Sequence, residues 1–212
     1  MDKHKLKDTR LHDVDFEVRQ LEDEGKTVIS GYALKFNKAS EDLGFTEYID
    51  RQALTGADMS NVVALLNHDS NYVLGRSGRN LTLSVDDTGL FFEIEPNDTS
   101  YVRDLMENMR SGLIDKCSFA FSIAKGGDEW RELKDGRYER TVKQIDKLYD
   151  VSVVTSPAYE DTVALLSQRS ADSFEAESSK KTVERLEELR QMEIELLDAD
   201  LGIELSNTES NL

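Results

Sequence analysis

The sequence contains one cysteine, Cys117, and only three histidines. A single thiol excludes an internal disulfide and fits a reducing compartment. Two of the histidines lie near the N-terminus, far in sequence from His68, so no zinc-type ligand set is predicted and neither a metal nor a cofactor is expected. No stretch approaches the ~20 apolar residues of a membrane-spanning helix, and the first residues lack the apolar core of a signal peptide. We therefore expect a protein that stays in the cytosol of the cell that makes it and has no membrane partner.

The sequence also contains few basic residues: 26 Lys and Arg residues stand against 43 Asp and Glu residues, which gives a formal net charge of −17. Such a surface repels phosphate backbones, so no direct binding to nucleic acid is expected. An acidic surface often means only solubility, although it can also dock on a basic protein partner. Mimicry of DNA by an acidic inhibitor would rest on the net charge alone and would leave the motifs of the core unexplained.

The apolar residues, 38% of the chain, suffice for a packed core, and 212 residues allow one domain with an appendage. Alternating or continuous apolar residues predict strands at 14–20, 27–36, 62–66, 81–85, 90–94, 116–123 and 148–155. Turn-rich segments predict hairpins around 22–25, 86–89 and 134–137. Residues 99–111 have the helical period, with Asp98 or Thr99 as N-cap and Gly112 just past the end. The predicted fold class is α+β, with a β-rich domain over residues 1–168.

The composition changes near residue 168. Residues 169–179 have the composition of a flexible linker. Residues 180–201 then carry apolar side chains at the spacing of an amphipathic helix. From residue 170 onward there are 12 acidic and 4 basic residues, so this part holds −8 of the net charge. We predict an acidic helical tail over residues 180–212, of a kind that can bind a partner or another subunit.

His68 is a candidate proton acceptor because it directly follows the apolar run 62–66. A buried strand would deliver it to a strand end, where scaffolds often present functional side chains. An imidazole there can take a proton near neutral pH and return it later. The plainer interpretation is a surface histidine in a turn.

Ser118 and Asp150 are the candidate partners of His68. Alternation in 116–123 places Ser118 on a face of small side chains, which would leave room for a peptide beside a nucleophile. Asp150 lies in an otherwise apolar strand, and alternation there assigns it to the same face as Leu148 and Ser152. A buried carboxylate needs a partner, and a histidine N–H would serve. The plainer interpretations are a serine that meets only water and an edge-strand charge that faces solvent.

Other familiar catalytic motifs are missing from the sequence. It contains no Gly-x-Ser-x-Gly elbow, no glycine-rich phosphate loop, no zincin helix and no paired-cysteine metal signature. Cys117 as a cysteine nucleophile is an alternative, but alternation places it on the apolar face with Phe119 and Phe121. We therefore interpret this cysteine as core packing.

Taken together and in order, eight segments resemble the prohead protease family of tailed bacteriophages, which is related in fold to the herpesvirus assembly proteases. The resemblance covers roughly residues 14–167. The segments that carry it are 31–36 (GYALKF), 47–50 (EYID), 65–69 (LLNHD), 74–76 (LGR), 87–90 (DTGL), 110–112 (RSG), 117–121 (CSFAF) and 150–159 (DVSVVTSPAY).

The resemblance implies a compact β-barrel flanked by helices and a serine protease mechanism. The histidine of the Asn-His-Asp motif falls on His68, and the nucleophile of the Ser-Phe-x-Phe motif falls on Ser118. The third member, commonly glutamate in the family, falls on Asp150. Arg76 matches a further family position to which we assign no role.

The resemblance also implies the substrates and the place of action. These would be the scaffold segment of the major capsid protein and the protease itself, cleaved inside the assembling prohead in the host cytoplasm, with self-association of the chain as a further expectation. The rival hypothesis is a non-catalytic scaffolding or capsid-assembly protein that retains the protease fold, and the acidic tail favours it.

Overall fold

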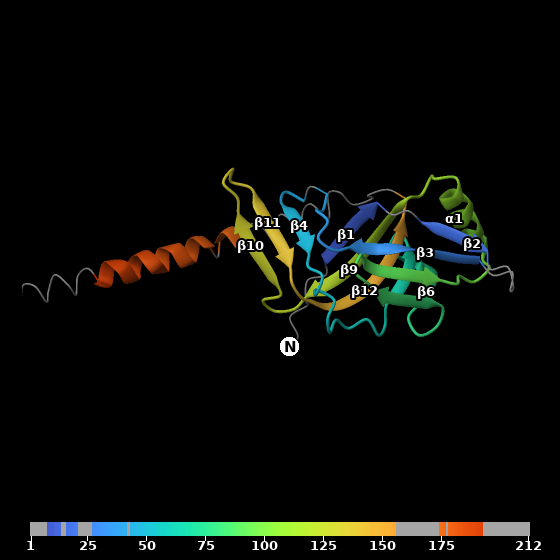
Figure 1. Cartoon of the computed structure of the whole chain (residues 1–212), viewed down its shortest axis with the longest axis horizontal. Helices are drawn as coiled ribbons and strands as arrows, with labels where there is room; N and C mark the ends of the chain where they lie inside the picture. The colour runs from blue at the N-terminus through green and yellow to red at the C-terminus, as the bar shows by residue number, and fades with distance from the viewer. Residues whose placement is uncertain are drawn as a thin grey trace, which may run out of the picture. The chain divides into compact units, whose positions relative to one another are not determined.

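The computed structural model describes residues 8–13, 16–20, 27–41, 43–155, 174–176 and 178–192 of the chain. The chain divides into two compact units, Met1–Gln168 and Arg169–Leu212, and each is described by itself. Figure 1 shows the strands of the first unit and the helix of the second. The predicted turn at 22–25, the motif residues 156–159 and the tail beyond 192 lie outside the described residues.

The largest sheet of the first unit has five strands. Its order is β1 (Asp8–Asp13), β9 (Lys116–Ile123), β12 (Ile145–Val154), β5 (Val63–Leu66) and β6 (Asp69–Arg76). The pair β12–β5 is parallel, and the other neighbours are antiparallel. The three central strands correspond to apolar runs that predicted them. The two edge strands are polar in sequence, which is why their periodicity gave no signal.

Two smaller sheets complete the first unit. The four-stranded sheet has the order β2 (Glu17–Gln20), β3 (Thr27–Lys35), β8 (Gly89–Ile94) and β7 (Leu81–Val85). The three-stranded sheet has the order β10 (Asp128–Glu132), β11 (Tyr138–Val142) and β4 (Thr46–Ile49). The antiparallel pairs β7–β8 and β10–β11 confirm the hairpins predicted around 86–89 and 134–137.

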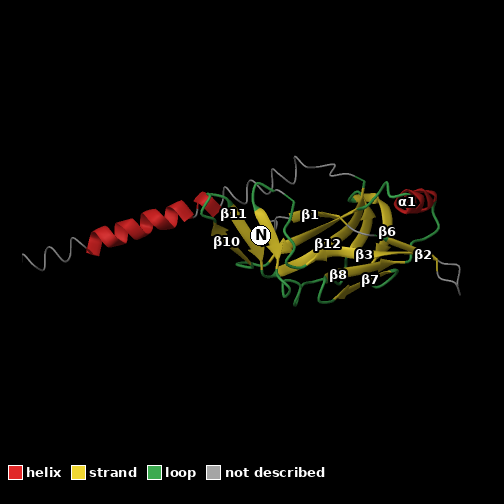
Figure 2. Cartoon of the chain, turned by 45° about the horizontal axis from the view of Figure 1, so that its top comes forward, coloured by secondary structure: helices red, strands yellow, loops and turns green. Residues whose placement is uncertain are grey.

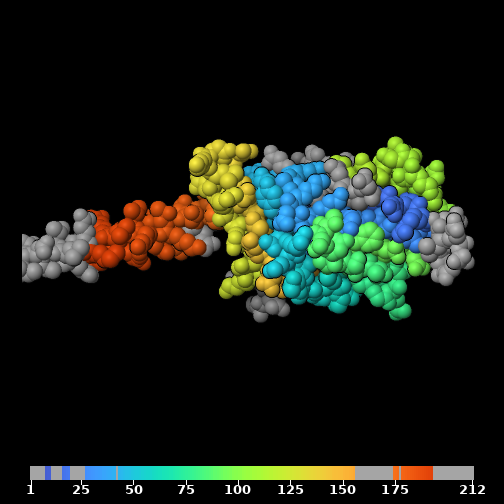
Figure 3. Space-filling model, viewed as in Figure 1, coloured from blue at the N-terminus to red at the C-terminus, as the bar shows by residue number. Residues whose placement is uncertain are grey.

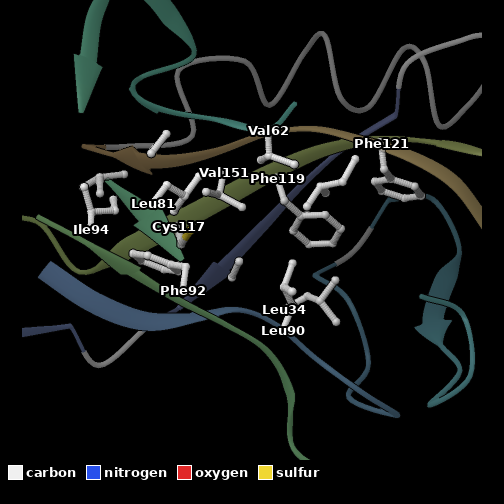
Figure 4. Packing of buried hydrophobic residues seen from close by; sticks show 14 of the residues in the cluster. Leu34, Val62, Leu81, Leu90, Phe92, Ile94, Cys117, Phe119, Phe121 and Val151 are labelled. Atoms are coloured by element: carbon white, nitrogen blue, oxygen red, sulfur yellow. The ribbon is translucent and has the colours of Figure 1, made fainter. Parts of the chain in front are cut away.

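The five-stranded and four-stranded sheets share one hydrophobic core. Figure 4 shows Leu34, Leu90 and Phe92 of the smaller sheet facing Cys117 and Phe119 of the larger one. Because alternate side chains of a strand point to opposite faces, the strands contribute mostly alternate residues to this core, with exceptions at register shifts in β3 and β12. The core therefore fixes the backbone of β9 and β12 from one side and leaves their other face for polar side chains.

The helix α1 (Ser100–Arg110) is the one helix among the described residues of the first unit, and Figure 2 shows it in red beside the strands. It buries Val102, Leu105 and Met109 in the shared core, as the predicted apolar stripe required. The predicted boundaries are confirmed, since Thr99 is the N-cap residue and Gly112 adopts a φ of +74° just past the end.

The prediction of a closed β-barrel is wrong for the described strands, which form three separate sheets. The edges of the five-stranded sheet are β1 and β6, those of the four-stranded sheet are β2 and β7, and no strand ladder among the described residues joins them. A single isolated β-bridge connects Ser77, the residue that follows β6, with Leu81 at the start of β7. The sheets therefore stay open, and the coarser prediction of a sheet-rich α+β domain is confirmed.

A buried ion network ties the three-stranded sheet to β1. Glu47 accepts hydrogen bonds from Arg10 Nε at 2.5 Å and from Arg140 Nη1 at 3.1 Å, and Arg140 Nε also donates to Asp128. Burial by itself would lower the pKa of the Arg10 guanidinium, but the carboxylates of Glu47 and Asp8 outweigh burial and raise that pKa above its ordinary value. No feature of the sequence predicted this network.

In the second unit, residues 174–176 and 178–192 are helical. The helix thus begins inside the range predicted as a linker, where Glu175 and Ala176 are good helix formers. Every described residue from 178 to 192 is exposed, and this segment is coloured orange-red in Figure 3. Among the described residues, no helix is long and apolar enough to span a membrane.

Candidate active site

His68 lies in a two-residue turn between β5 and β6. Leu66 pairs with Asp69 across the hairpin, and the two turn residues have positive φ, +54° at Asn67 and +56° at His68. This is the backbone of a type I′ turn, whose twist matches the flanking strands and which favours Asn at its first position. Asn67 also anchors the turn to the end of β12, since its N–H donates to Val153 O and its Oδ1 accepts from Thr155 N.

Ser118 lies on the polar face of β9. The neighbouring residues Cys117 and Phe119 point into the core, as Figure 4 shows, so Ser118 points the other way together with Ala120 and Ser122. The predicted alternation of β9 is therefore confirmed. The polar face is covered as well, and Ser118 is only 3% exposed.

Asp150 reaches the same face through a β-bulge in β12. Leu148 pairs with Phe121 and Asp150 with Ala120, so Tyr149 is an extra residue opposite one step of β9. The bulge places Leu148 in the core and Asp150 on the opposite, polar face. The prediction that Leu148 shares the face of Asp150 is thus wrong, because strict alternation does not allow for a bulge. The prediction that Ser152 shares the face of Asp150 is confirmed.

The structure brings His68, Ser118 and Asp150 into direct contact. The Nδ1 atom of His68 lies 2.6 Å from Asp150 Oδ1, and its Nε2 atom lies 2.7 Å from Ser118 Oγ. The Asp150 side chain is 4% exposed and the imidazole 24% exposed. A buried carboxylate facing Nδ1 requires the proton on that nitrogen, which leaves the lone pair of Nε2 for the serine hydroxyl.

Two further residues belong to this constellation, and sequence reasoning gave neither of them a role. Ser152 of β12 lies opposite Ser118 in the strand register, and its Oγ is 3.1 Å from both His68 Nδ1 and Asp150 Oδ1. Asn67 shapes the turn that presents His68. The one available signal was the Asn-His dipeptide between two strands, because Asn tolerates the left-handed conformation that a tight hairpin needs.

The alternative nucleophile, Cys117, is fully buried in the core on the opposite face of β9. Burial raises the pKa of its thiol to about 12, and the charge of Asp150 adds to the effect. Because the thiolate is the reactive form, this cysteine is unreactive near neutral pH. The interpretation as core packing is confirmed.

Arg76 is placed at the end of β6, where its Nη1 donates to Asn61 Oδ1 at 2.6 Å. This contact holds the segment before β5 rather than any of the three candidate residues. Within the described part of the chain, no group of three or more His, Cys, Asp or Glu side chains is placed to hold a metal ion.

Comparison with known proteins gives one family match. The model of the caudovirus prohead serine protease family matches residues 14–177. No curated protein sequence matches the chain. Among solved structures, the capsid assembly protease gp21 of bacteriophage T4 aligns with a TM-score of 0.47 and 12% sequence identity, over 71% of this chain and 99% of that one.

Proposed function

Because the chain belongs to the caudovirus prohead serine protease family, we propose that it is a serine endopeptidase that cleaves the scaffold region of the major capsid protein, and itself, during prohead maturation. The observation that carries the proposal is the unbroken set of contacts from Ser118 Oγ through the imidazole of His68 to Asp150. A hydroxyl, a base and an orienting carboxylate in this order are the parts of a serine nucleophile system.

Each step assigns one role to one side chain. Ser118 Oγ attacks the scissile carbonyl carbon while its proton passes to His68 Nε2. The carboxylate of Asp150 stabilises the imidazolium that forms, and His68 then gives the proton to the leaving amine. A water molecule, deprotonated by the same imidazole, attacks the acyl-enzyme, and the returning proton restores the Ser118 hydroxyl.

The family also supports a place of action and a set of partners. A prohead protease acts inside the assembling capsid, so we propose that the chain works there, in the host cytoplasm, on capsid proteins and on further copies of itself. The substrate would approach from the side of His68, since the imidazole is the most exposed of the three side chains.

The test of this proposal is Ser118→Ala in the full chain, expressed with the major capsid protein and analysed by mass spectrometry. Removing the nucleophile is expected to lower the cleavage rate by a factor on the order of 10⁴ or more. The matched control is Ser122→Ala, which removes another buried hydroxyl from the same face of β9. Cleavage of capsid protein and of the chain itself by Ser118→Ala would refute the mechanism.

A second role, in capsid assembly, is favoured by the helix of residues 178–192. Its apolar side chains Val183, Leu186, Leu189 and Met192 are between 45% and 61% exposed. Such a stripe is a typical site for a protein partner. We propose that the tail recruits the protease domain into proheads. Deletion of 170–212 should reduce incorporation and spare peptide cleavage, and unchanged incorporation would contradict this role.

A further inference from the structure

A second serine, Ser152, contacts the same imidazole as Ser118. Its hydroxyl oxygen is 3.1 Å from His68 Nδ1 and 3.1 Å from Asp150 Oδ1, and the residue is 0% exposed. It therefore bridges the two groups whose contact orients the imidazole, from a position that neither solvent nor a peptide can reach.

The protonation pattern decides what Ser152 can do there. Since Nδ1 carries a proton toward Asp150, it cannot accept the proton of Ser152. The hydroxyl of Ser152 therefore donates to Asp150 Oδ1. A nucleophilic serine must face an unprotonated ring nitrogen, and Ser118 meets that condition at Nε2 whereas Ser152 does not. The two serines are thus chemically distinct although both lie within hydrogen-bond distance of His68.

We infer that Ser152 is a positioning residue for the proposed protease, acting on the reaction through Asp150. Its donated hydrogen bond fixes the rotation of the carboxylate so that one oxygen stays directed at Nδ1. A buried carboxylate with a second donor keeps this geometry when the imidazole becomes charged. This inference rests on the proposed function, because the imidazolium arises only if Ser118 gives up its proton.

The test compares Ser152→Ala with the control Ser122→Ala in the full chain. Both residues are 0% exposed serines on the polar face of the sheet, but Ser122 contacts Asp146 and Tyr149. We expect Ser152→Ala to lower kcat for a peptide substrate about tenfold or more, since a hydrogen bond to a charged group is lost. Its KM should stay within about twofold, because a residue hidden from substrate does not alter binding. Ser122→Ala should keep the wild-type kcat.

A second variant separates hydrogen bonding from packing. Ser152→Cys keeps nearly the same volume but offers a much weaker donor, so its kcat should fall as well while thermal unfolding stays near wild type. Wild-type kcat in both Ser152 variants, or an equal fall in Ser122→Ala, would overturn the inference. Failure of the wild-type chain to cleave the peptide or to react with a fluorophosphonate probe would instead overturn the proposed function.

Discussion

At Asp150, a side chain one methylene shorter than the glutamate expected from the family resemblance still reaches His68 Nδ1 at 2.6 Å. The bulge at Tyr149 turns this side chain to the face of Ser118, and the hydroxyl of Ser152 donates a hydrogen bond to its Oδ1 atom. At the scale of single residues, the proposed chemistry therefore depends on one carboxylate that a hydroxyl of its own strand helps to orient.

Asp150→Asn should keep the size of this side chain and remove its charge. We expect kcat to fall by roughly 10³- to 10⁴-fold, because the imidazolium loses its counter-charge and the wrong tautomer becomes favourable. Steady-state cleavage of a peptide measures this effect, with Asp146→Asn on the same strand as the control. A fall of less than about tenfold would remove Asp150 from the mechanism.

Cys117 predicts a loss of stability at alkaline pH. Its thiol has a pKa of about 12 in the folded protein, against an ordinary value of 9.0. Above pH 9 the unfolded chain releases this proton while the folded chain keeps it, so the free energy of unfolding falls as pH rises from 9 toward 12. Urea titrations between pH 8 and 11 should show a smaller decline for Cys117→Val, which cannot ionise. Equal slopes for the two proteins would contradict the prediction.

At the scale of elements, the β5–β6 hairpin determines where His68 stands. Two consecutive non-glycine residues in the left-handed region cost ~1–2 kcal/mol each. The contacts of Asn67 with Val153 and Thr155 offset this cost and hold the turn against the end of β12. A histidine on a longer loop would lose this fixed approach to β9 and β12.

Asn67→Ala should therefore destabilise the folded protein and also lower the kcat of peptide cleavage. Alanine disfavours positive φ and loses the bond from Thr155 N, so about 1–2 kcal/mol of unfolding free energy should disappear. Asn37 is the matched control, since its φ is +53° at a turn outside the candidate site. Both Ala variants should lower the urea midpoint, and Asn67→Ala should in addition lower kcat. Parallel losses of activity in the two would show that the hairpin has no special role.

Sequence reasoning predicted most of these elements and none of their irregularities. The apolar period gave β3, β9, β12 and α1 close to their observed bounds. The bulge at Tyr149 was not predicted, because strict alternation leaves no place for an extra residue between Leu148 and Asp150. The strands β1 and β6 were missed since polar edge strands are formed by pairing with neighbours rather than by burying their own side chains.

At the scale of the whole molecule, the candidate site is assembled from segments that are distant in sequence. His68 and Asp150, which are in contact, are 82 residues apart along the chain. The sequence motifs predict His68, Ser118 and Asp150 as candidates, but the contacts among the three residues follow from strand order and register. Ser152 illustrates the limit of sequence reasoning. Alternation assigns it to the face of Asp150, but its contact with the imidazole follows only from the register that places it opposite Ser118.

The buried ion network around Glu47 joins β1 of the five-stranded sheet to β4 and β11 of the three-stranded sheet. Arg10 belongs to β1, and β1 pairs with β9 in a register that places Leu11 opposite Ser118. The network therefore fastens the strand that flanks the proposed nucleophile to the three-stranded sheet. The two arginines and Glu47 are each less than 10% exposed, so each buried charge depends on its oppositely charged partner in place of water.

Glu47→Ala should consequently cost much more than the loss of an exposed ion pair. It leaves Arg10 and Arg140 buried with like charges and without their shared carboxylate, for which we expect about 3–5 kcal/mol of lost unfolding free energy. The exposed Arg131, paired with Glu139 in the three-stranded sheet, supplies the control, and Arg131→Ala should cost about 0–1 kcal/mol. Urea unfolding measures both. Fluorophosphonate labelling of Ser118 should also slow in Glu47→Ala at temperatures where the protein is still folded, since β1 is then held less firmly against β9. A cost below about 1 kcal/mol would mean that Asp8 and Asp128 alone can neutralise the two arginines.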